Sequence, residues 1–296
     1  MYMAPISDAV ILAGGAGTRM LPASLYGFKE SLPLVDTPIL NHLVWEAARS
    51  GVSRIHLVLS DRKMHLLNEF LEVDFVFEGD VRTDLPRDSL RLGTDGIEII
   101  PHVQKKPGGV ADAIATAIKG IEGPFLVLLG DMVLLDEQLG PKYSGPNYAS
   151  TASLSLVKSY EDTGLPCVGV YGVGDSEIAK YGIVKIEEGL VRDIVEKPKN
   201  TESPGNQILC GRYIFPADTD ELLARFPKSV HGELQSIAIL HEIICRPGLR
   251  AVNLDHMRMY DSGEPLSWLK SQIDHALRRS DIGPSLADWL EKRMRQ

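Results

Sequence analysis

Three closely spaced glycines followed by two basic residues are the first group in this chain that could do chemistry. The glycines follow a short apolar run at residues 9–13, and they are Gly14, Gly15 and Gly17. Because glycine has no Cβ, backbone N–H groups in such a loop can approach a ligand closely. Arg19 and Lys29 bring two positive charges to the same region. Bare N–H groups beside two cations at the end of a strand suit a polyphosphate.

Two common phosphate-binding loops do not fit these glycines. A P-loop needs a second glycine followed by Lys and Ser/Thr at fixed spacing, and none follows here. A dinucleotide-binding fingerprint needs a third glycine where Met20 stands. The glycines alone would also suit a tight turn that binds nothing, and the nearby basic pair argues against that interpretation.

A further candidate for ligand binding is Gln104, which comes directly after a strand expected at 97–103. This position places it at the ligand-binding edge of a parallel sheet. Its carboxamide offers a donor and an acceptor side by side, and the N3–H and O4 of uracil and thymine complement that pair. We predict that Gln104 reads the base. The alternative is a glutamine that simply follows a strand at the surface.

An aspartate comes directly after the strongly apolar stretch 124–130. A carboxylate at the end of a buried strand faces the same crevice as the glycine loop. Magnesium takes hard oxygen ligands, usually one or two carboxylates together with phosphate oxygens. We predict that Asp131 is a metal ligand, with Asp136 as a weaker competitor and a solvated aspartate as the alternative.

These groups need a sheet whose strands end at one edge. The pattern predicts apolar strands at residues 9–13, 54–59, 97–103 and 124–130, and helices at residues 39–49 and 61–71. Such alternation is typical of right-handed parallel crossovers and a doubly wound α/β sheet. Short strands are expected next, at residues 151–157, 167–173, 183–186, 190–195, 206–215 and 250–259. A hairpin turn is expected at residues 187–189. Two amphipathic helices, 266–277 and 284–294, could pack on the body or on another subunit.

Composition narrows the class of protein. The 296 residues are 44% hydrophobic and 24% charged, which are ordinary globular values. A net charge of −9 argues against a nucleic-acid binder. The chain shows no signal-peptide pattern and no apolar run long enough to span a membrane. Three cysteines at unrelated spacings indicate a reducing compartment, so we expect a cytoplasmic protein without a membrane partner.

The motifs together resemble the signature of the sugar-1-phosphate nucleotidyltransferases. The resemblance is carried by GGAGTRMLP at 14–22 and KESLPLVDTP at 29–38, followed in order by motifs as far as residue 263. Within that family the chain looks most like the uridylyltransferases, with the thymidylyltransferases next. The implied fold is a Rossmann-like, doubly wound mixed sheet. The resemblance also implies one domain at residues 1–262, followed by a C-terminal helical extension at residues 263–296. The domain would consist of a nucleotide half at about 1–148 and a sugar-phosphate half at about 149–262.

The resemblance also assigns roles to individual residues. Nucleotide-binding residues would be Ala13, Gly14, Gly15, Gly17, Thr18, Arg19, Lys29, Gln104 and Gly109. Sugar-phosphate-binding residues would be Gly182, Glu196, Lys197 and Gly211. Asp131 and Asp261 would hold Mg²⁺, and the catalytic residues would be Arg19, Lys29, Asp131 and Lys197. The segment 231–235 resembles a uridylyltransferase phrase whose following aspartate is missing here, which weakens the assignment of a particular sugar.

The expected activity is transfer of a nucleotidyl group from an NTP, most readily UTP, to a sugar 1-phosphate, most readily glucose 1-phosphate. The partners are then these two substrates and further copies of the chain in a homo-oligomer. Two alternatives stay open. One is a thymidylyl- or cytidylyltransferase that acts on another phosphorylated substrate. The other is a nucleotide-sugar-binding regulator without catalysis, which would be expected to have lost one of the charged site residues.

Overall fold

The structure is a computed structural model that describes residues 5–64, 67, 96–106, 108–137, 149–199, 202–225 and 236–296. The helix expected at 61–71 begins at residue 61, and most of it lies outside the described residues. The segment 231–235 also lies outside them.

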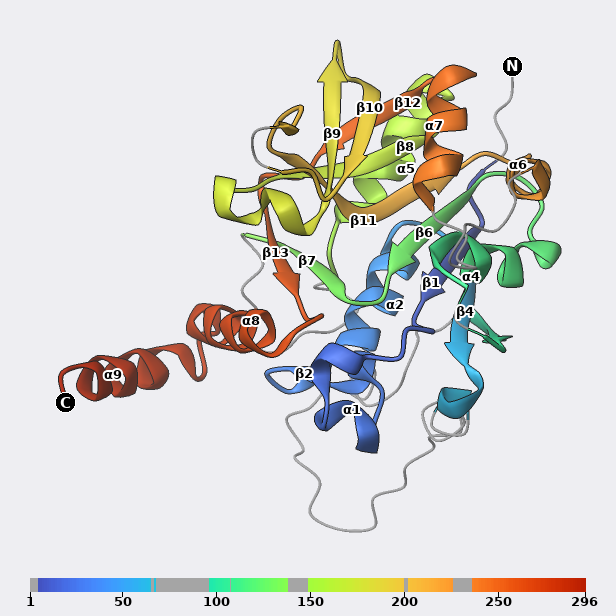
Figure 1. The fold of residues 1–296 in the computed structure, drawn as a ribbon. Coiled ribbons are helices and arrows are strands. Elements are labelled where there is room, and N and C mark those ends of the chain that lie inside the picture. Colours follow the sequence, from blue (N-terminus) through green and yellow to red (C-terminus); the bar gives the residue numbers. More distant parts are fainter. Residues whose placement is uncertain are drawn as a thin grey trace.

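The first half of the chain forms the parallel part of a nine-stranded sheet (Figure 1). Its strands are β1 (Asp8–Leu12), β4 (Arg54–Ser60), β5 (Glu98–Gln104) and β6 (Phe125–Leu129). They lie in the order β5-β4-β1-β6 and pair in parallel, so their carboxyl ends share one edge. The strand order reverses at β1, and ligands of such sheets bind outside the carboxyl ends at this reversal.

The β1–β4 and β5–β6 connections contain helices. Between β1 and β4 lie the short segments η1 (Thr18–Met20), α1 (Ala23–Tyr26), η2 (Lys29–Ser31), β2 (Pro33–Leu34) and β3 (Thr37–Pro38), then helix α2 (Ile39–Arg49). Between β5 and β6 lie α4 (Val110–Ala117) and η4 (Ile118–Gly120). The predicted strands and the 39–49 helix are confirmed within one or two residues.

The second half completes the sheet with mixed pairing. The added strands are β8 (Cys167–Gly172), β9 (Gly182–Glu187), β10 (Leu190–Glu196), β11 (Gln207–Phe215) and β12 (Leu249–Asn253), and between β8 and β9 lies η6 (Asp175–Lys180). β11 pairs antiparallel with β6 and β8, whereas β12 pairs parallel with β8. β9 and β10 form the hairpin predicted around residues 187–189. The expected doubly wound mixed sheet is therefore confirmed.

Two expectations about this half are wrong. Residues 151–157 do not form a strand but begin helix α5 (Ala152–Thr163). The apolar and serine residues alternate there as in a strand, yet the buried ones, which are Ala152, Ser153, Leu156 and Val157, follow helical spacing. The stretch 250–259 is not one strand, because β12 ends at Asn253 and a turn precedes β13 (Met257–Asp261). β13 leaves the large sheet and pairs with β7 (Met132–Asp136).

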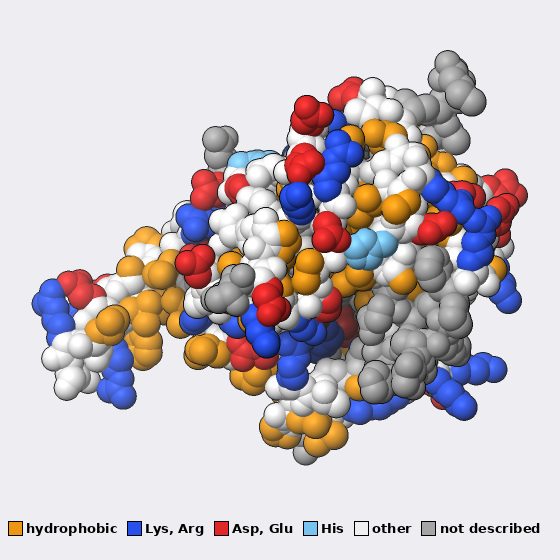
Figure 2. Space-filling view, turned by 45° about the horizontal axis from the view of Figure 1, so that its top comes forward, with side chains coloured by type: hydrophobic (Ala, Val, Ile, Leu, Met, Phe, Trp, Pro, Cys, Tyr) orange, Lys and Arg blue, Asp and Glu red, His pale blue; other side chains and the backbone are white. Residues whose placement is uncertain are grey.

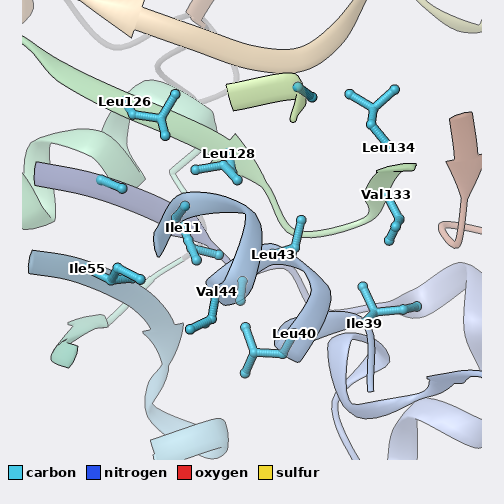
Figure 3. Close-up of a cluster of buried hydrophobic side chains, with 14 of the residues drawn as sticks. Ile11, Ile39, Leu40, Leu43, Val44, Ile55, Leu126, Leu128, Val133 and Leu134 are labelled. Carbon is cyan, nitrogen blue, oxygen red and sulfur yellow. The ribbon is translucent and has the colours of Figure 1, made fainter. Parts of the chain in front are cut away.

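Helices cover both faces of the sheet. α2 and α5 contribute to the core on one face, and α4, α6 (Thr219–Arg225) and α7 (Ser236–Cys245) contribute to the core on the other. Strand residues alternate between these cores, as Ile11 and Val10 of β1 illustrate. In Figure 3 the side chains of Ile11 and Leu128 lie against those of α2. This packing fixes the strand ends from which the site residues extend.

The C-terminal helices α8 (Pro265–Arg278) and α9 (Gly283–Met294) lie beside the sheet domain, and α9 extends away from it (Figure 1). α8 is anchored to the β2–β3 turn, where Gln272 accepts a hydrogen bond from the Val35 N–H at 2.7 Å. Apolar side chains remain exposed along these helices (Figure 2), among them Leu266, Leu269, Trp289 and Met294. Among the described residues, no helix is long and apolar enough to cross a membrane.

Candidate active site

The glycine loop leaves the carboxyl end of β1 and turns back over the sheet edge. Gly17 has φ of +65°, a conformation that favours glycine. A Cβ on Gly14 would lie only 2.8 Å from Oε1 of Gln104, so this position also needs glycine. Thr18 and Arg19 follow in η1 with exposed side chains. The predicted nucleotide-binding loop and the predicted base-reading glutamine therefore lie in contact.

A buried lysine that sequence reasoning missed supports this loop from below. Nζ of Lys63 donates to the carbonyl oxygens of Ala13 and Gly15, the latter at 2.7 Å, and to Oε2 of Glu30 at 3.0 Å. Its neighbour Arg62 donates to the carbonyl of Ser24 at 2.7 Å. Burial lowers the pKa of Lys63, although the nearby Glu30 carboxylate acts to raise it. Burial raises the pKa of Glu30. Three hydrogen bonds use all the donors of the ammonium group.

The position of Lys63 decides where the loop N–H groups point. In a trans peptide unit the C=O and N–H bonds point in opposite directions. Because the carbonyls of Ala13 and Gly15 point at Lys63, the N–H groups of the following residues, Gly14 and Ala16, point away from it. The loop thus directs donors away from the buried ammonium, as phosphate binding requires.

Lys29 and Asp131 form an ion pair at the carboxyl ends of β1 and β6. Nζ of Lys29 lies 2.7 Å from Oδ2 of Asp131 and 3.7 Å from Oε1 of Glu30. Burial alone would raise the pKa of Asp131, but Lys29 holds it below its ordinary value. Burial alone would likewise lower the pKa of Lys29, but Asp131 and Glu30 hold it above. Both groups are therefore charged at neutral pH.

The second predicted metal ligand, Asp261, lies beside the first. It ends β13 and pairs with Met132 of β7, the residue after Asp131. The backbone N–H of Ser262 donates to the Asp131 carbonyl at 2.9 Å, which ties the two segments together. The position of Gly263 shows that Arg19 belongs to this group, since a Cβ there would lie 2.8 Å from Arg19 Nη2 and 2.9 Å from Asp261 Oδ1.

The competing aspartate, Asp136, has a structural role at the other end of β7. Its carboxylate accepts hydrogen bonds from the hydroxyl of Thr151 at 2.6 Å and from the Thr151 N–H at 3.2 Å. Thr151 directly precedes helix α5, so Asp136 fixes the start of that helix. Asp136 therefore stabilises the fold at a distance from the glycine loop, whereas Asp131 lies beside that loop.

The predicted sugar-phosphate residues lie at the ends of β9 and β10. Glu196 and Lys197 are both more than half exposed, and Nζ of Lys197 lies 3.4 Å from Oε1 of Glu196. A Cβ on Gly182 would lie 3.1 Å from Oε2 of Glu196. Lys197 has φ of 45°, which is uncommon for a residue with a side chain. Its N–H donates to the carbonyl of Tyr181 at 3.0 Å, and this bond stabilises the turn.

Tyr181 connects this group to the carboxylates. Its hydroxyl donates to Oδ2 of Asp261 at 3.2 Å, and burial raises the pKa of the hydroxyl, which stays protonated. The sequence marks Gly182 as a site residue but not its neighbour Tyr181, because a contact across 80 positions leaves no local pattern.

Gly211 lies in β11 next to β6. Its φ is +77°, within a register shift between Leu209 and Tyr213, and a Cβ there would lie 3.0 Å from the Cβ of Leu129. The next residue, Arg212, is fully buried and pairs with Glu46 of α2 at 2.7 Å. The bulge therefore brings Gly211 close to Leu129, the last residue of β6, which lies two positions before Asp131.

Gln104 ends β5, and its amide is held from the side of helix α4. Nε2 donates to Oδ2 of Asp112 at 2.8 Å and lies 3.5 Å from the carbonyl oxygen of Gly109. Gly109 has φ of +87° and precedes α4, so the predicted pair Gln104 and Gly109 is in contact. Figure 2 shows basic and acidic side chains around a hollow in one face of the molecule.

Taken together, the glycine loop, two cations and two carboxylates lie at one edge of the sheet, an arrangement that suits a phosphate-bearing ligand. A sequence model of the nucleotidyl transferase family matches residues 8–274. This chain belongs to that family, as the motifs predicted.

Two curated relatives and two solved structures illustrate what the chain is similar to. The chain is 30% identical to UTP–glucose-1-phosphate uridylyltransferase 2 of Staphylococcus saprophyticus, with 98% of this chain and 99% of the relative covered. It is 32% identical to the UTP–glucose-1-phosphate uridylyltransferase of Staphylococcus haemolyticus, with 98% and 99% covered. Among solved structures, UDP-glucose pyrophosphorylase of Acinetobacter baumannii matches with a TM-score of 0.83 at 25% identity, covering 97% of this chain and 99% of the other. A UTP-bound structure from that organism matches with a TM-score of 0.81 at 26% identity, covering 96% and 98%.

Proposed function

We propose that this protein transfers the uridylyl group of UTP to glucose 1-phosphate and releases pyrophosphate and UDP-glucose. The relatives named above carry this activity in their names, and similar solved structures hold UTP or UDP-glucose. The observation that carries the proposal is the ion pair of Lys29 and Asp131 beside the glycine loop. A triphosphate placed there meets loop N–H groups, a cation and a carboxylate.

The chemistry needs no protein nucleophile. An anionic phosphate oxygen of the sugar 1-phosphate attacks the α-phosphorus of UTP in line, and a new P–O bond forms. The bond from the α-phosphorus to the bridging oxygen breaks, and pyrophosphate leaves with the electron pair. Catalysis is then mostly positioning and neutralisation of charge. Arg19 and Lys29 neutralise the triphosphate and the departing pyrophosphate.

The two carboxylates fit a magnesium ion that enters with the nucleotide. Asp131 and Asp261 lie on paired segments next to the loop, and each is held by a donor, Lys29 and Tyr181 respectively. Among the residues that the structure describes, no three His, Cys, Asp or Glu side chains gather as a metal site. Two carboxylates suit Mg²⁺, which usually keeps water and phosphate oxygens as its other ligands. When bound, the ion would supply positive charge at the α-phosphate.

The acceptor is held by the groups at the ends of β9 and β10. The carboxylate of Glu196 can accept hydrogen bonds from two vicinal hydroxyls of the sugar, and the ammonium of Lys197 can neutralise and aim the phosphate. Gly182 and Gly211 let the sugar lie close to the backbone. Within this sugar-phosphate half, residues 149–262, Tyr181 connects the proposed metal ligand Asp261 to Lys197.

Gln104 reads the base in this proposal, with Gly109 beside it. Uracil and thymine share the edge that a glutamine contacts, so Gln104 accepts UTP and dTTP alike. A non-catalytic regulator is disfavoured because Arg19, Lys29, Asp131 and Asp261 are all present and close together. We further propose a homo-oligomer in the cytoplasm. The exposed apolar residues of α8 and α9 support the homo-oligomer. The three free cysteines support a reducing compartment such as the cytoplasm.

The proposal is tested by pyrophosphate release with Mg²⁺ and glucose 1-phosphate, using UTP, dTTP, CTP, ATP and GTP in parallel. Turnover with UTP, and less with dTTP, is expected. If no pyrophosphate is released with any of the nucleotides, glucose 1-phosphate is rejected as the acceptor.

A further inference from the structure

The carboxamide of Gln104 is fixed in one of its two orientations. On one side, Nε2 donates to Asp112 Oδ2 at 2.8 Å, with the Gly109 carbonyl at 3.5 Å. On the other side, Oε1 faces Gly14, where a Cβ would approach it to 2.8 Å. The end of the amide that faces two acceptor oxygens must be the nitrogen, because an oxygen there would have no donor. The residue is only 9% exposed, so little room remains for other rotamers.

Asp112 is itself placed by the backbone around it. It lies in the first turn of α4, where the positive end of the helix stabilises a carboxylate. Gly108 leaves the space for it, since a Cβ at that position would lie 2.4 Å from Cγ of Asp112. A side chain at residue 108 would therefore displace the carboxylate. Gly14 and Gly108 leave room for a fixed pair of polar side chains between them.

The fixed orientation has a consequence for base selection. An amide that presents Oε1 can accept the N3–H of uracil or thymine. Cytosine has an acceptor at N3, and meeting it would require the amide to turn over and present N–H. The turned amide would place its oxygen against the carboxylate of Asp112, two acceptors without a proton between them.

We propose that Asp112 is a positioning residue that makes this site select the imide bases, uracil and thymine, over cytosine by holding the Gln104 amide in one orientation. This inference rests on the proposed function in one respect, namely that Gln104 faces the base of the bound nucleotide. It assigns to Asp112 no contact with the substrate. Uracil and thymine share the imide edge, so Asp112 does not distinguish UTP from dTTP.

The test compares the wild type with Asp112→Ala and Asp112→Asn, using Thr116→Ala as the matched control. Thr116 lies on the same helix and its hydroxyl donates to the backbone carbonyl of Asp112, so the control leaves the Asp112 side chain in place. For each protein, kcat/KM is measured with UTP, dTTP and CTP, and dissociation constants are measured for UMP and CMP by calorimetry.

In Asp112→Ala the amide is free to turn, so kcat/KM with CTP should rise while that with UTP changes little. The UTP-to-CTP preference should fall about tenfold, equivalent to ~1.4 kcal/mol. Asp112→Asn, whose side-chain carbonyl can still accept from Nε2, should lie between. The UTP-to-dTTP ratio should stay constant in all variants. A gain with CTP is a result that mere damage to the fold would not produce.

An unchanged UTP-to-CTP ratio in Asp112→Ala, an equal loss with every nucleotide, or equal binding of UMP and CMP by the wild type would overturn the inference. If the wild type selects UMP and Asp112→Ala loses that selection, the inference stands even without turnover of glucose 1-phosphate. In that case the result rejects only the proposal that glucose 1-phosphate is the acceptor.

Discussion

The hydroxyl of Tyr181 donates a hydrogen bond of 3.2 Å to the carboxylate of Asp261. Tyr181 also accepts the N–H of Lys197 through its carbonyl, so one residue contacts both a proposed metal ligand and the residue proposed to hold the sugar phosphate. The proposed metal ligand and the proposed sugar-phosphate ligand are thereby held in one arrangement.

Removing the Tyr181 hydroxyl should loosen that arrangement without unfolding the protein. In Tyr181→Phe we expect kcat/KM to fall roughly tenfold, because about 1.4 kcal/mol of positioning is lost, and the Mg²⁺ concentration for half-maximal activity to rise. Steady-state pyrophosphate release against Mg²⁺ measures both. Tyr171→Phe is the control, since the Tyr171 hydroxyl donates to the Met257 carbonyl at 3.3 Å and not to a proposed site residue that the structure describes. Equal behaviour of the two variants would show that the bond to Asp261 has no role.

Lys63 should matter for both stability and nucleotide binding. Lys63→Met removes the nearer of the two cations beside the buried Glu30 and leaves Lys29 at 3.7 Å, which should lower the free energy of unfolding by up to about 3–5 kcal/mol. The loop carbonyls also lose their donor, so KM for UTP should rise on the order of tenfold. Urea unfolding and steady-state kinetics measure the two effects.

The double variant Lys63→Met with Glu30→Gln separates these effects. It should recover much of the stability, because no buried charge is left unpaired, yet its KM for UTP should stay high. Recovery of both quantities together would mean that Lys63 acts on stability alone.

Two buried histidines should make the protein less stable in mild acid. His42 and His275 lie with ring centroids 6.1 Å apart, and burial lowers the pKa of His42 to about 3 and that of His275 to about 4. The unfolded chain takes up these protons near pH 6.5, whereas the folded state resists them. Stability is therefore fully present above pH 6.5 and falls progressively as the pH drops toward 4, by about 2 kcal/mol for each histidine at pH 5.

Denaturant unfolding at pH 7.5 and pH 5 measures this loss. His275→Phe should reduce it, and His256→Gln, at an exposed position, should leave it unchanged. Equal loss in the wild type and in His275→Phe would show that His275 does not contribute.

The sequence predicts the nucleotide half well because its signals are local. Each parallel strand is a short apolar run, and Gly14, Gln104 and Asp131 follow directly after such runs. The middle of the chain was harder, because the alternating serines and apolar residues of α5 fit either a strand or a helix. Burial of Leu156 and Val157 against the sheet decides in favour of the helix, and the sequence alone does not show it.

The residues that support the site were missed for a related reason. Lys63 and Tyr181 act through contacts 50 and 80 positions away in the sequence, and Asp112 acts through a side-chain contact with Gln104, so no known spacing marks these residues. A lysine shortly after a strand, or an aspartate in the first turn of a helix, is common at a protein surface. Only the packed structure shows that Lys63 is buried beneath the glycine loop.

The most direct test of the central claim is pyrophosphate release from UTP and glucose 1-phosphate by the wild type and Asp131→Asn, with the exposed Asp193→Asn as control. We expect turnover by the wild type and the control. Asp131→Asn should lose at least about 100-fold in kcat/KM, ~2.7 kcal/mol, while its thermal unfolding shows a folded protein. Full activity of folded Asp131→Asn would contradict the account.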